Sequence, residues 1–320
     1  MLTRQLGTTG IVTSEIGFGA WGIGGWTTGQ LSYGATDDAT SLAALERALA
    51  IGYTLVDTAP LYGLGHSEEL VGRAIRGRRD RVVLATKAGY RSYGDAADYS
   101  PDAVERSLAA SLRRLGTDHV DVLQLHSPPM DLLRRRPEIV GGLVRLQERG
   151  LIRTFGLSAA SPAEAAAAIR EFGFPVVQVN FNMLDVRCVT DGVFAAAREC
   201  GTGLVARTPL CFGFLTGTIA ADTVFPAEDH RSRWNGPQVA RWVKGADDVL
   251  ALAGARRRGD EVETALRFPL AFPEVAAIIP GILTPAEAEA NARASSAGPL
   301  AADLVEQVVA YNRTSSPFSR

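Results

Sequence analysis

The chain has 320 residues, of which 46% are hydrophobic and 21% are charged, and its formal net charge at pH 7 is −2. This balance produces no field that would favour nucleic acid or an anionic membrane, so we expect small-molecule partners and no nucleic-acid partner. The N-terminus lacks the apolar segment of a signal peptide, and no apolar stretch reaches the ~18 residues of a membrane span, which predicts a cytoplasmic protein. Three cysteines without Cys-x-x-Cys spacing argue against a disulfide framework or a zinc site, so we expect no bound metal.

Strand-like and helix-like segments alternate along the chain after an opening hairpin. The hairpin is predicted by alternating polar and apolar residues around Gly7 to Gly10. Short apolar runs predict strands at 15–19, 53–57, 81–86, 120–125, 152–157, 175–180, 202–206 and 275–280. Helical patterns lie at about 38–51, 66–77, 101–115, 136–149, 162–171, 189–200, 238–268 and 285–294. Eight such units without a Pro-, Gly- or Ser-rich linker predict one α/β domain over 1–320, as a parallel barrel or a doubly wound sheet.

One connection, the segment 212–240, is rich in turn residues and too long for an ordinary loop. Loops of this length are usually functional lids or locally disordered. We expect this segment to contribute to a substrate pocket.

Four ionisable residues follow or end three consecutive predicted strands. Asp57 and Tyr62 lie in LVDTAPLYG, Lys87 in VVLATKAG and His126 in VLQLHSPP. Singly, each has an ordinary explanation, as a turn cap, a surface aromatic, a solvated strand end or a satisfied core histidine. Jointly they point to chemistry, because the C-terminal ends of parallel barrel strands converge on one mouth.

These residue types suit the reduction of a carbonyl. Hydride addition leaves an alkoxide that needs a proton, and free tyrosine, with a pKa of about 10, is a weak acid near neutrality. We expect Lys87 to lower the pKa of Tyr62, and Asp57 to hold Lys87 charged and oriented. His126 would donate a hydrogen bond to the substrate oxygen or join the proton relay.

A literal GxGxxG match at Gly17, Gly19 and Gly22 suggests a Rossmann nucleotide site, but its context argues against one. That fingerprint requires a helix opening at the glycines and an acidic residue about 20 positions later. No helical pattern begins here before about residue 37. We therefore do not expect a Rossmann fold.

The chain resembles the aldo-keto reductase family over nearly its whole length. The resemblance includes LGTTGIVTSEIGFGAWGIGG, DTAPLYGLGHSEELVGRAI, LATKAG, SLRRLGTDHVDVLQLHSP, GLSAAS and IIPGILTPAEAEANARAS. It implies a (β/α)8 TIM barrel with an N-terminal β-hairpin and extra C-terminal helices, which binds extended NAD(P)H at the C-terminal mouth. It also implies a catalytic tetrad of Asp57, Tyr62, Lys87 and His126, acting on a carbonyl or alcohol substrate.

The resemblance further implies the residues that bind cofactor and substrate. Ser158 and Gln178 would bind the nicotinamide carboxamide, and the loop from Thr208 to Gly217 would lie over the pyrophosphate. The implied cofactor-binding residues are Gly19, Trp21, Ser158, Gln178, Arg207, Thr208, Leu210, Gly213, Leu215, Gly217, Gly281, Thr284, Glu287 and Asn291. The implied substrate-binding residues are Trp21, Tyr62, His126 and Tyr90.

Thr284 and Glu287 also have a purely structural explanation. Thr284-Pro285-Ala286-Glu287 is a helix start in which the hydroxyl caps the helix and the glutamate completes a capping box. A helix N-terminus after the last barrel strand is equally a recurrent phosphate site. Both explanations remain open at this point.

The chain departs from the family pattern at three places. Ala159 follows Ser158 where relatives commonly have asparagine, and Arg207 stands where many have an aromatic residue that stacks on nicotinamide. The segment 281–284 has no Lys or Arg to pair with the 2′-phosphate of NADP, and Glu287 adds a negative charge. The cofactor is therefore expected to be NADP(H) or NAD(H), with NAD(H) favoured over the family's usual NADP(H).

Two other functions compete with this prediction. Channel β-subunits resemble the same family, so the chain could be a cofactor-binding regulatory subunit with little turnover. An unrelated barrel lyase or isomerase could use Lys87 as a Schiff-base amine. Mixed aromatic and polar residues at the mouth leave sugars, small aldehydes and ketones open as substrates.

Overall fold

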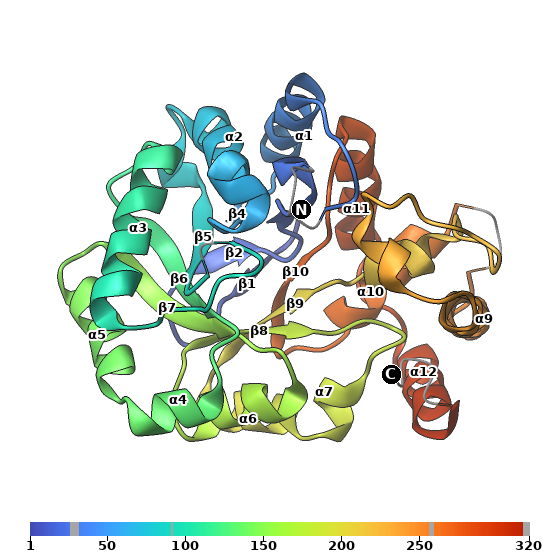
Figure 1. Ribbon diagram of the computed structural model, residues 1–320. Coiled ribbons are helices and arrows are strands. Elements are labelled where there is room, and N and C mark those ends of the chain that lie inside the picture. The colour runs from blue at the N-terminus through green and yellow to red at the C-terminus, as the bar shows by residue number, and fades with distance from the viewer. Residues whose placement is uncertain (26–31, 91, 256–258, 316–320) are drawn as a thin grey trace.

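The computed structural model describes residues 1–25, 32–90, 92–255 and 259–315, and it has the barrel architecture expected from the sequence (Figure 1). Eight parallel strands pair in the order of the chain, from β3 to β10. They are β3 Phe18–Gly19, β4 Leu55–Asp57, β5 Val83–Ala88, β6 Val120–His126, β7 Ile152–Ser158, β8 Val176–Asn180, β9 Gly203–Arg207 and β10 Val275–Ile279. Parallel bridges from Ile16 to Ile278 and from Gly19 to Gly281 bring the two edges of the sheet together.

Helices cover the outside of the sheet. They are α1 Asp38–Ala50, α2 His66–Ile75, α3 Pro101–Leu115, α4 Met130–Arg135, α5 Glu138–Glu148, α6 Pro162–Arg170, α7 Arg187–Thr190, α8 Val193–Cys200, α9 Gly236–Leu252, α10 Glu261–Leu270, α11 Pro285–Ala297 and α12 Ala302–Ser315. The extra helices α9 and α12 lie side by side outside the ring (Figure 1), where the hydroxyl of Tyr311 donates to Asp248 at 2.6 Å.

The predicted hairpin closes the bottom of the barrel. Strands β1 Thr3–Gln5 and β2 Val12–Ser14 are antiparallel. Leu6 and Ile11 from the hairpin are buried in the same cluster as barrel side chains such as Leu55 and Val205. Gly7 makes this approach possible, because it has a φ of +56° and a Cβ there would lie 2.3 Å from the backbone nitrogen of Gly203.

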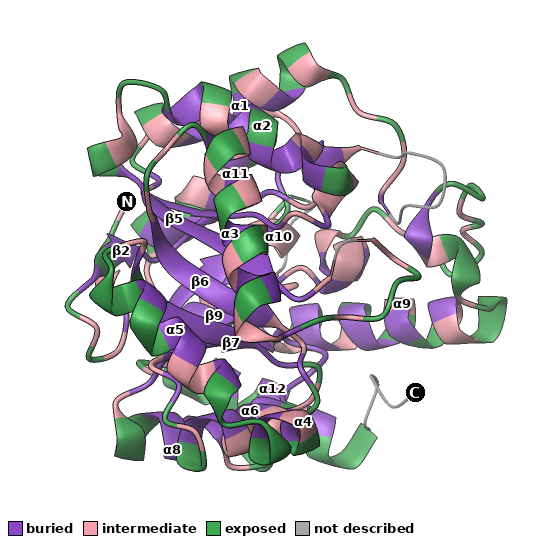
Figure 2. Ribbon diagram, turned by 60° about the vertical axis from the view of Figure 1, so that its left-hand side comes forward, coloured by how far each residue is buried: buried purple, intermediate pink, exposed green. Residues whose placement is uncertain are grey.

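Burial follows the pattern that the sequence predicts for a barrel. The strands are buried along almost their whole length, whereas the helices bury one face and expose the other (Figure 2). Parallel strands covered on both faces carry near-continuous apolar runs, which explains why their positions were predictable. Within the described part of the chain, no helix is long and apolar enough to span a membrane.

Three element predictions differ from the structure. The strand expected at 15–19 is reduced to Phe18–Gly19, because the residues before it join the last strand through an isolated bridge. The helical tract expected at 238–268 is two helices, α9 and α10, and its residues 256–258 lie outside the described residues. The helix expected at 189–200 is two short helices, α7 and α8, and the short helix α4 was not expected.

The segment 212–240 contains two 3₁₀ turns, at Cys211–Thr216 and His230–Arg233, and is tied to the rest of the barrel mouth. The backbone of Asp229 bridges to Ser32, and the amide of His230 donates to the Ser32 carbonyl at 2.9 Å. Arg231 pairs with Asp229 at 2.6 Å and donates to the Phe212 carbonyl at 3.1 Å. We call residues 229–231 the strap, because they link the loop after β9 to the loop after β3.

Candidate active site

A buried ion pair lies at the C-terminal ends of β4 and β5. Lys87 donates from Nζ to Asp57 Oδ1 at 2.5 Å and to the Thr58 carbonyl at 2.9 Å. Burial depresses the pKa of Lys87, but the charges of Asp57 and Tyr62 outweigh it, so the pKa ends above its ordinary value. Lys87 is therefore a fully buried ammonium, kept charged by the partner that the sequence predicted.

Asp57 is also held by two amide side chains that the sequence did not link to it. Gln124 from β6 and Gln178 from β8 donate to Asp57 Oδ2 at 2.8 and 2.9 Å. The intervening strand β7 presents Gly156, where a Cβ would lie 3.4 Å from Gln124 and 2.7 Å from the Val176 carbonyl. The missing side chain lets β7 lie against the Val176 carbonyl of β8, next to the glutamines that reach the carboxylate.

Tyr62 lies beside this pair, at the start of the 3₁₀ turn Tyr62–Gly65 that follows β4. Lys87 Nζ is 4.9 Å from the centroid of the Tyr62 ring. Burial raises the pKa of Tyr62, and Lys87 opposes that rise without cancelling it. The net shift is thus opposite to the lowering expected from the sequence, because loss of hydration outweighs the neighbouring charge.

His126 ends β6 and faces Tyr62, with the two ring centroids 6.4 Å apart. Burial, together with the charges of Lys87 and Arg207, lowers the pKa of His126 to about 3. The imidazole is therefore neutral near pH 7, and one of its nitrogens can donate a hydrogen bond.

Asp57, Tyr62 and His126 line a cavity of about 320 Å³ at the barrel mouth, whereas the buried Lys87 does not line it. Of the residues expected from the sequence, those that line it are Gly19, Trp21, Asp57, Tyr62, His126, Ser158, Gln178, Arg207, Thr208 and Gly281. Tyr90 does not line this cavity; its ring packs behind His126, at 5.7 Å between centroids.

Three further aromatic residues complete the wall: Phe212, from the segment 212–240 that was expected to contribute to the pocket, and Tyr33 and Tyr93, which were not named from the sequence. Trp21 donates from its indole nitrogen to the Tyr93 hydroxyl at 3.2 Å, and its ring lies 4.9 Å from that of Tyr33. Tyr93 follows Tyr90 by three residues in the loop after β5, so the loop position was a usable signal, whereas Tyr33 depends on contacts with the distant strap.

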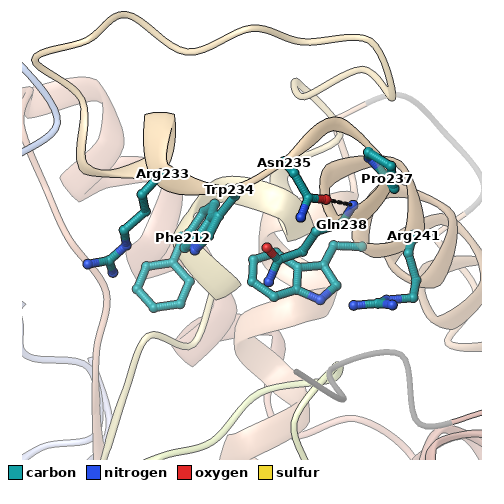
Figure 3. Close-up of a pocket in the computed structure, with 8 residues that line it drawn as sticks. Phe212, Arg233, Trp234, Asn235, Pro237, Gln238 and Arg241 are labelled. Carbon is teal, nitrogen blue, oxygen red and sulfur yellow. Dashed lines mark hydrogen bonds between the residues drawn. The ribbon is translucent and has the colours of Figure 1, made fainter.

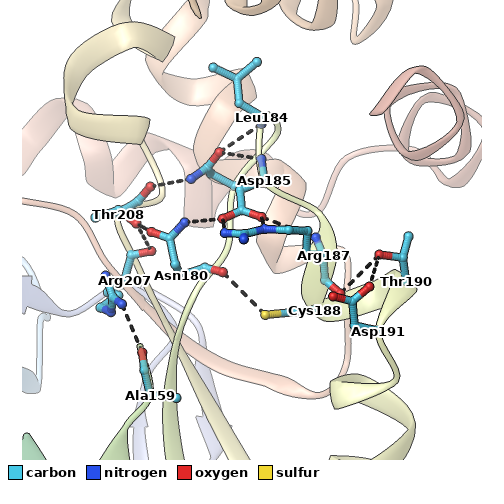
Figure 4. Close-up of polar contacts among 11 residues, drawn as sticks. Ala159, Asn180, Leu184, Asp185, Arg187, Cys188, Thr190, Asp191, Arg207 and Thr208 are labelled. Atoms are coloured by element: carbon cyan, nitrogen blue, oxygen red, sulfur yellow. Dashed lines mark hydrogen bonds and ion pairs between the residues drawn. The ribbon is translucent and has the colours of Figure 1, made fainter. Parts of the chain in front are cut away.

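The end of β9 is held by a polar network (Figure 4). Thr208, at a φ of +54°, donates from its hydroxyl to Asn180, and its carbonyl accepts from Asn182 at 3.0 Å. Arg207 donates to the Ala159 carbonyl at 3.0 Å. The turn after β9 is thus fixed by two asparagine side chains at and after the end of β8, and the Ala159 carbonyl after β7 holds Arg207 at the cavity wall.

A second cavity, of about 280 Å³, continues from the first toward α11. Both cavities are lined by Gly22, Tyr33, Thr208, Phe212 and Gly281, so they are direct neighbours. The expected residues Leu210, Gly213 and Glu287 also line the second cavity, whereas Leu215, Gly217, Thr284 and Asn291 do not.

The start of α11 is occupied by its own capping box. Thr284 accepts from the Glu287 amide at 3.2 Å, and Glu287 accepts from the amides of Leu283 and Thr284 at 2.6 and 3.1 Å. One turn further, Nδ2 of the buried Asn291 has no hydrogen-bond partner among the described residues. A buried donor without a partner costs stability unless a ligand meets it. Asn291 does not line the second cavity, so it is the elongated shape of the two neighbouring cavities, and not this donor, that fits an extended dinucleotide.

Comparisons with known proteins agree with this geometry. Residues 15–313 match the Aldo/keto reductase family. The chain is 30% identical to the aldo-keto reductase YhdN of Bacillus subtilis, covering 89% of this chain and 86% of the relative. It is 32% identical to the NADH-specific methylglyoxal reductase of Escherichia coli, covering 68% of this chain and 70% of the relative.

Solved structures give the same result. A holo aldo-keto reductase from Bacillus halodurans superposes with a TM-score of 0.78 at 27% identity, over 97% of this chain and 96% of the other. A glycerol dehydrogenase from Gluconobacter oxydans superposes with a TM-score of 0.79 at 27% identity, over 97% and 95%. This chain belongs to the aldo/keto reductase family, oxidoreductases that use NAD(P)H on carbonyls or alcohols.

Proposed function

We propose that Tyr62 is the general acid when this enzyme reduces a carbonyl, and the general base when it oxidises an alcohol. The observation that carries this proposal is the buried Lys87 ammonium, 4.9 Å from the Tyr62 ring and anchored by Asp57. A bound nicotinamide would supply or accept the hydride at the substrate carbon. Tyr62 gives its proton to the developing alkoxide, and Lys87 stabilises the tyrosinate that remains until solvent reprotonates it.

His126 orients the substrate oxygen in this proposal. With its pKa lowered to about 3, the imidazole stays neutral and offers an N–H to the carbonyl. Two donors, Tyr62 and His126, then meet at the oxygen where negative charge develops. Placing donors at that position is the usual source of electrostatic stabilisation in a transition state.

The cofactor residues remain those implied by the sequence. Ser158 and Gln178, which line the first cavity and hydrogen-bond each other at 3.3 Å, would hold the carboxamide. Arg207 would stack on the nicotinamide ring through its planar guanidinium. The loop 208–217 would cover the pyrophosphate, and Gly281, Thr284, Glu287 and Asn291 would bind the adenosine end.

We propose that the cofactor is NAD(H). Known relatives carry both specificities in their names, since the aldo-keto reductase yakc of Schizosaccharomyces pombe is NADP(+)-linked and the E. coli relative is NADH-specific. The support comes from the second cavity, where Glu287 contributes a carboxylate and Arg231 is already paired with Asp229. Leu283→Arg should therefore raise kcat/KM with NADPH relative to NADH, whereas Leu2→Arg, at an exposed site on the hairpin side, should not.

Small carbonyl or polyol substrates fit the size of the first cavity, and the names of the E. coli and G. oxydans relatives point to the same class. These names give no support to a regulatory subunit. The test is to follow nicotinamide absorbance with small aldehydes and ketones, and with sugars and polyols in the oxidative direction. We expect turnover that Tyr62→Phe abolishes, and unchanged turnover in this variant would contradict the assignment.

A further inference from the structure

A third cavity lies on the far side of Phe212 from the catalytic groups. It has a volume of about 650 Å³, and its walls include Phe212, Arg233, Trp234, Gln238, Arg241 and Trp242 (Figure 3). Phe212 lines this cavity and also the active-site cavity, so the two are neighbours separated by one side chain. None of the proposed catalytic residues lines the third cavity, and Phe212 is its one lining residue from the loop 208–217 that is proposed to cover the pyrophosphate.

Aromatic rings form a continuous wall along this cavity. The centroids of Phe212 and Trp234 are 5.2 Å apart, and those of Trp234 and Trp242 are 4.8 Å apart. Figure 3 shows Arg233 at one end of this row and Arg241 at the other. Such a wall suits an apolar or aromatic group, and the guanidinium of Arg233 suits an anion.

Arg233 differs in its partners from Arg231, two residues earlier. Arg231 is neutralised by Asp229 at 2.6 Å and serves the strap. Arg233 is exposed, its guanidinium carbon lies 5.8 Å from the Trp234 ring, and in the described parts of the chain no carboxylate lies within ion-pair distance of it. Its charge therefore forms no ion pair that stabilises the described part of the fold.

The positive charge of Arg233 extends to the active-site cavity. Burial raises the pKa of Tyr93, which lines that cavity, to about 12, and the charges of Lys87 and Arg233 both oppose the rise. The residues that line the third cavity in the described structure include two arginines and no acid, although the whole chain has a net charge of −2. Concave surfaces lined by one sign of charge attract ligands of the opposite sign.

We propose that the third cavity binds the distal end of an extended carbonyl substrate that carries a carboxylate, and that Arg233 determines this specificity. The inference rests on the proposed function, because it requires the carbonyl to lie at Tyr62. The aromatic wall then accommodates an aryl or long alkyl linker past Phe212, and Arg233 pairs with the carboxylate. Aldehydes with a terminal carboxylate are the substrate class that this arrangement selects.

The test compares ω-oxo carboxylates of increasing length, and 4-formylcinnamate, with their neutral methyl esters. We expect wild-type kcat/KM to favour the acid over its ester at least tenfold at the length that reaches Arg233. Arg233→Gln should remove this preference by lowering kcat/KM for the acid about tenfold and leaving the ester unchanged, and Arg233→Lys should keep part of it. Arg135→Gln, which removes an exposed charge on α4, should change neither substrate.

The outcomes separate the inference from the function on which it rests. Tyr62-dependent turnover without any acid preference, or equal losses for acid and ester in Arg233→Gln, would overturn the inference and leave the proposed function standing. If the enzyme reduces neither the acids nor the esters nor the small aldehydes, the proposed function fails and the inference fails with it. The acid preference should also shrink as salt concentration rises, because the site is open to solvent.

Discussion

Replacing Lys87 with methionine should separate the structural and catalytic roles of the buried ion pair. The substitution leaves Asp57 buried, with Gln124 and Gln178 as its remaining donors. Removing one partner of a buried pair typically costs ~3–5 kcal/mol, and because two donors remain we expect about 3 kcal/mol. At an unfolding entropy of ~2.1 cal/mol/K per residue, the 320 residues give ~0.7 kcal/mol/K, so the melting temperature should fall by roughly 4 to 5 °C.

The double variant Lys87→Met/Asp57→Asn provides the control. It removes the unpaired charge, so thermal unfolding should show that most of the lost stability returns. Activity should not return: without Lys87, burial raises the pKa of Tyr62 with only the weaker effect of Arg207 against it, and we expect a loss of kcat of at least ~100-fold in both variants. A single variant that melts at the wild-type temperature, or a double variant with restored turnover, would refute this account of the pair.

Three further predictions concern other parts of the barrel. Gly156→Ala should destabilise the protein by ~1–3 kcal/mol in chemical denaturation, because its Cβ would lie 2.7 Å from the Val176 carbonyl. If the variant were as stable as wild type, the two strands could move apart at little energetic cost. Asn291→Leu should leave the stability equal or higher, since it removes a buried donor without a partner, but should weaken cofactor binding about tenfold by fluorescence titration; unchanged affinity would remove this residue from the adenosine site. His126, with a pKa of about 3 when folded against ~6.5 when unfolded, contributes stability that is complete above pH ~6.5 and is lost as the pH falls toward 3. The unfolding free energy of His126→Gln should therefore fall less steeply than that of wild type between pH 6.5 and 4, and identical slopes would contradict the depressed pKa.

Much of the barrel could be predicted because buried parallel strands have a strong local signature. The apolar runs that end at Asp57, Lys87 and His126 identified three neighbouring strands and the mouth they share. The closure between Ile16 and Ile278 could not be predicted in the same way. It depends on two segments that are distant in the chain, and no local periodicity encodes their pairing.

Residues of the candidate site could be predicted from the sequence only where they lie at the ends of strands. Gln124 and Gln178 meet Asp57 because the registers of the parallel strands bring residues from β4, β6 and β8 together, and no single strand's sequence reveals those registers. Tyr33 and Phe212 come from loops whose positions depend on the strap. The direction of the Tyr62 pKa shift was mispredicted because it depends on how deeply the ring is buried, which neighbouring sequence does not reveal.

In the proposed mechanism, Tyr62 delivers the proton while other residues hold the cofactor. A single-turnover measurement of nicotinamide absorbance, with the enzyme–NADH complex mixed with a substrate aldehyde, tests it most directly when wild type and Tyr62→Phe are compared at equal cofactor saturation. We predict that Tyr62→Phe binds NADH with wild-type affinity and oxidises it ~100- to 10,000-fold more slowly, the usual contribution of a positioned acid. Oxidation at the wild-type rate by the saturated variant would show that Tyr62 does not deliver the proton.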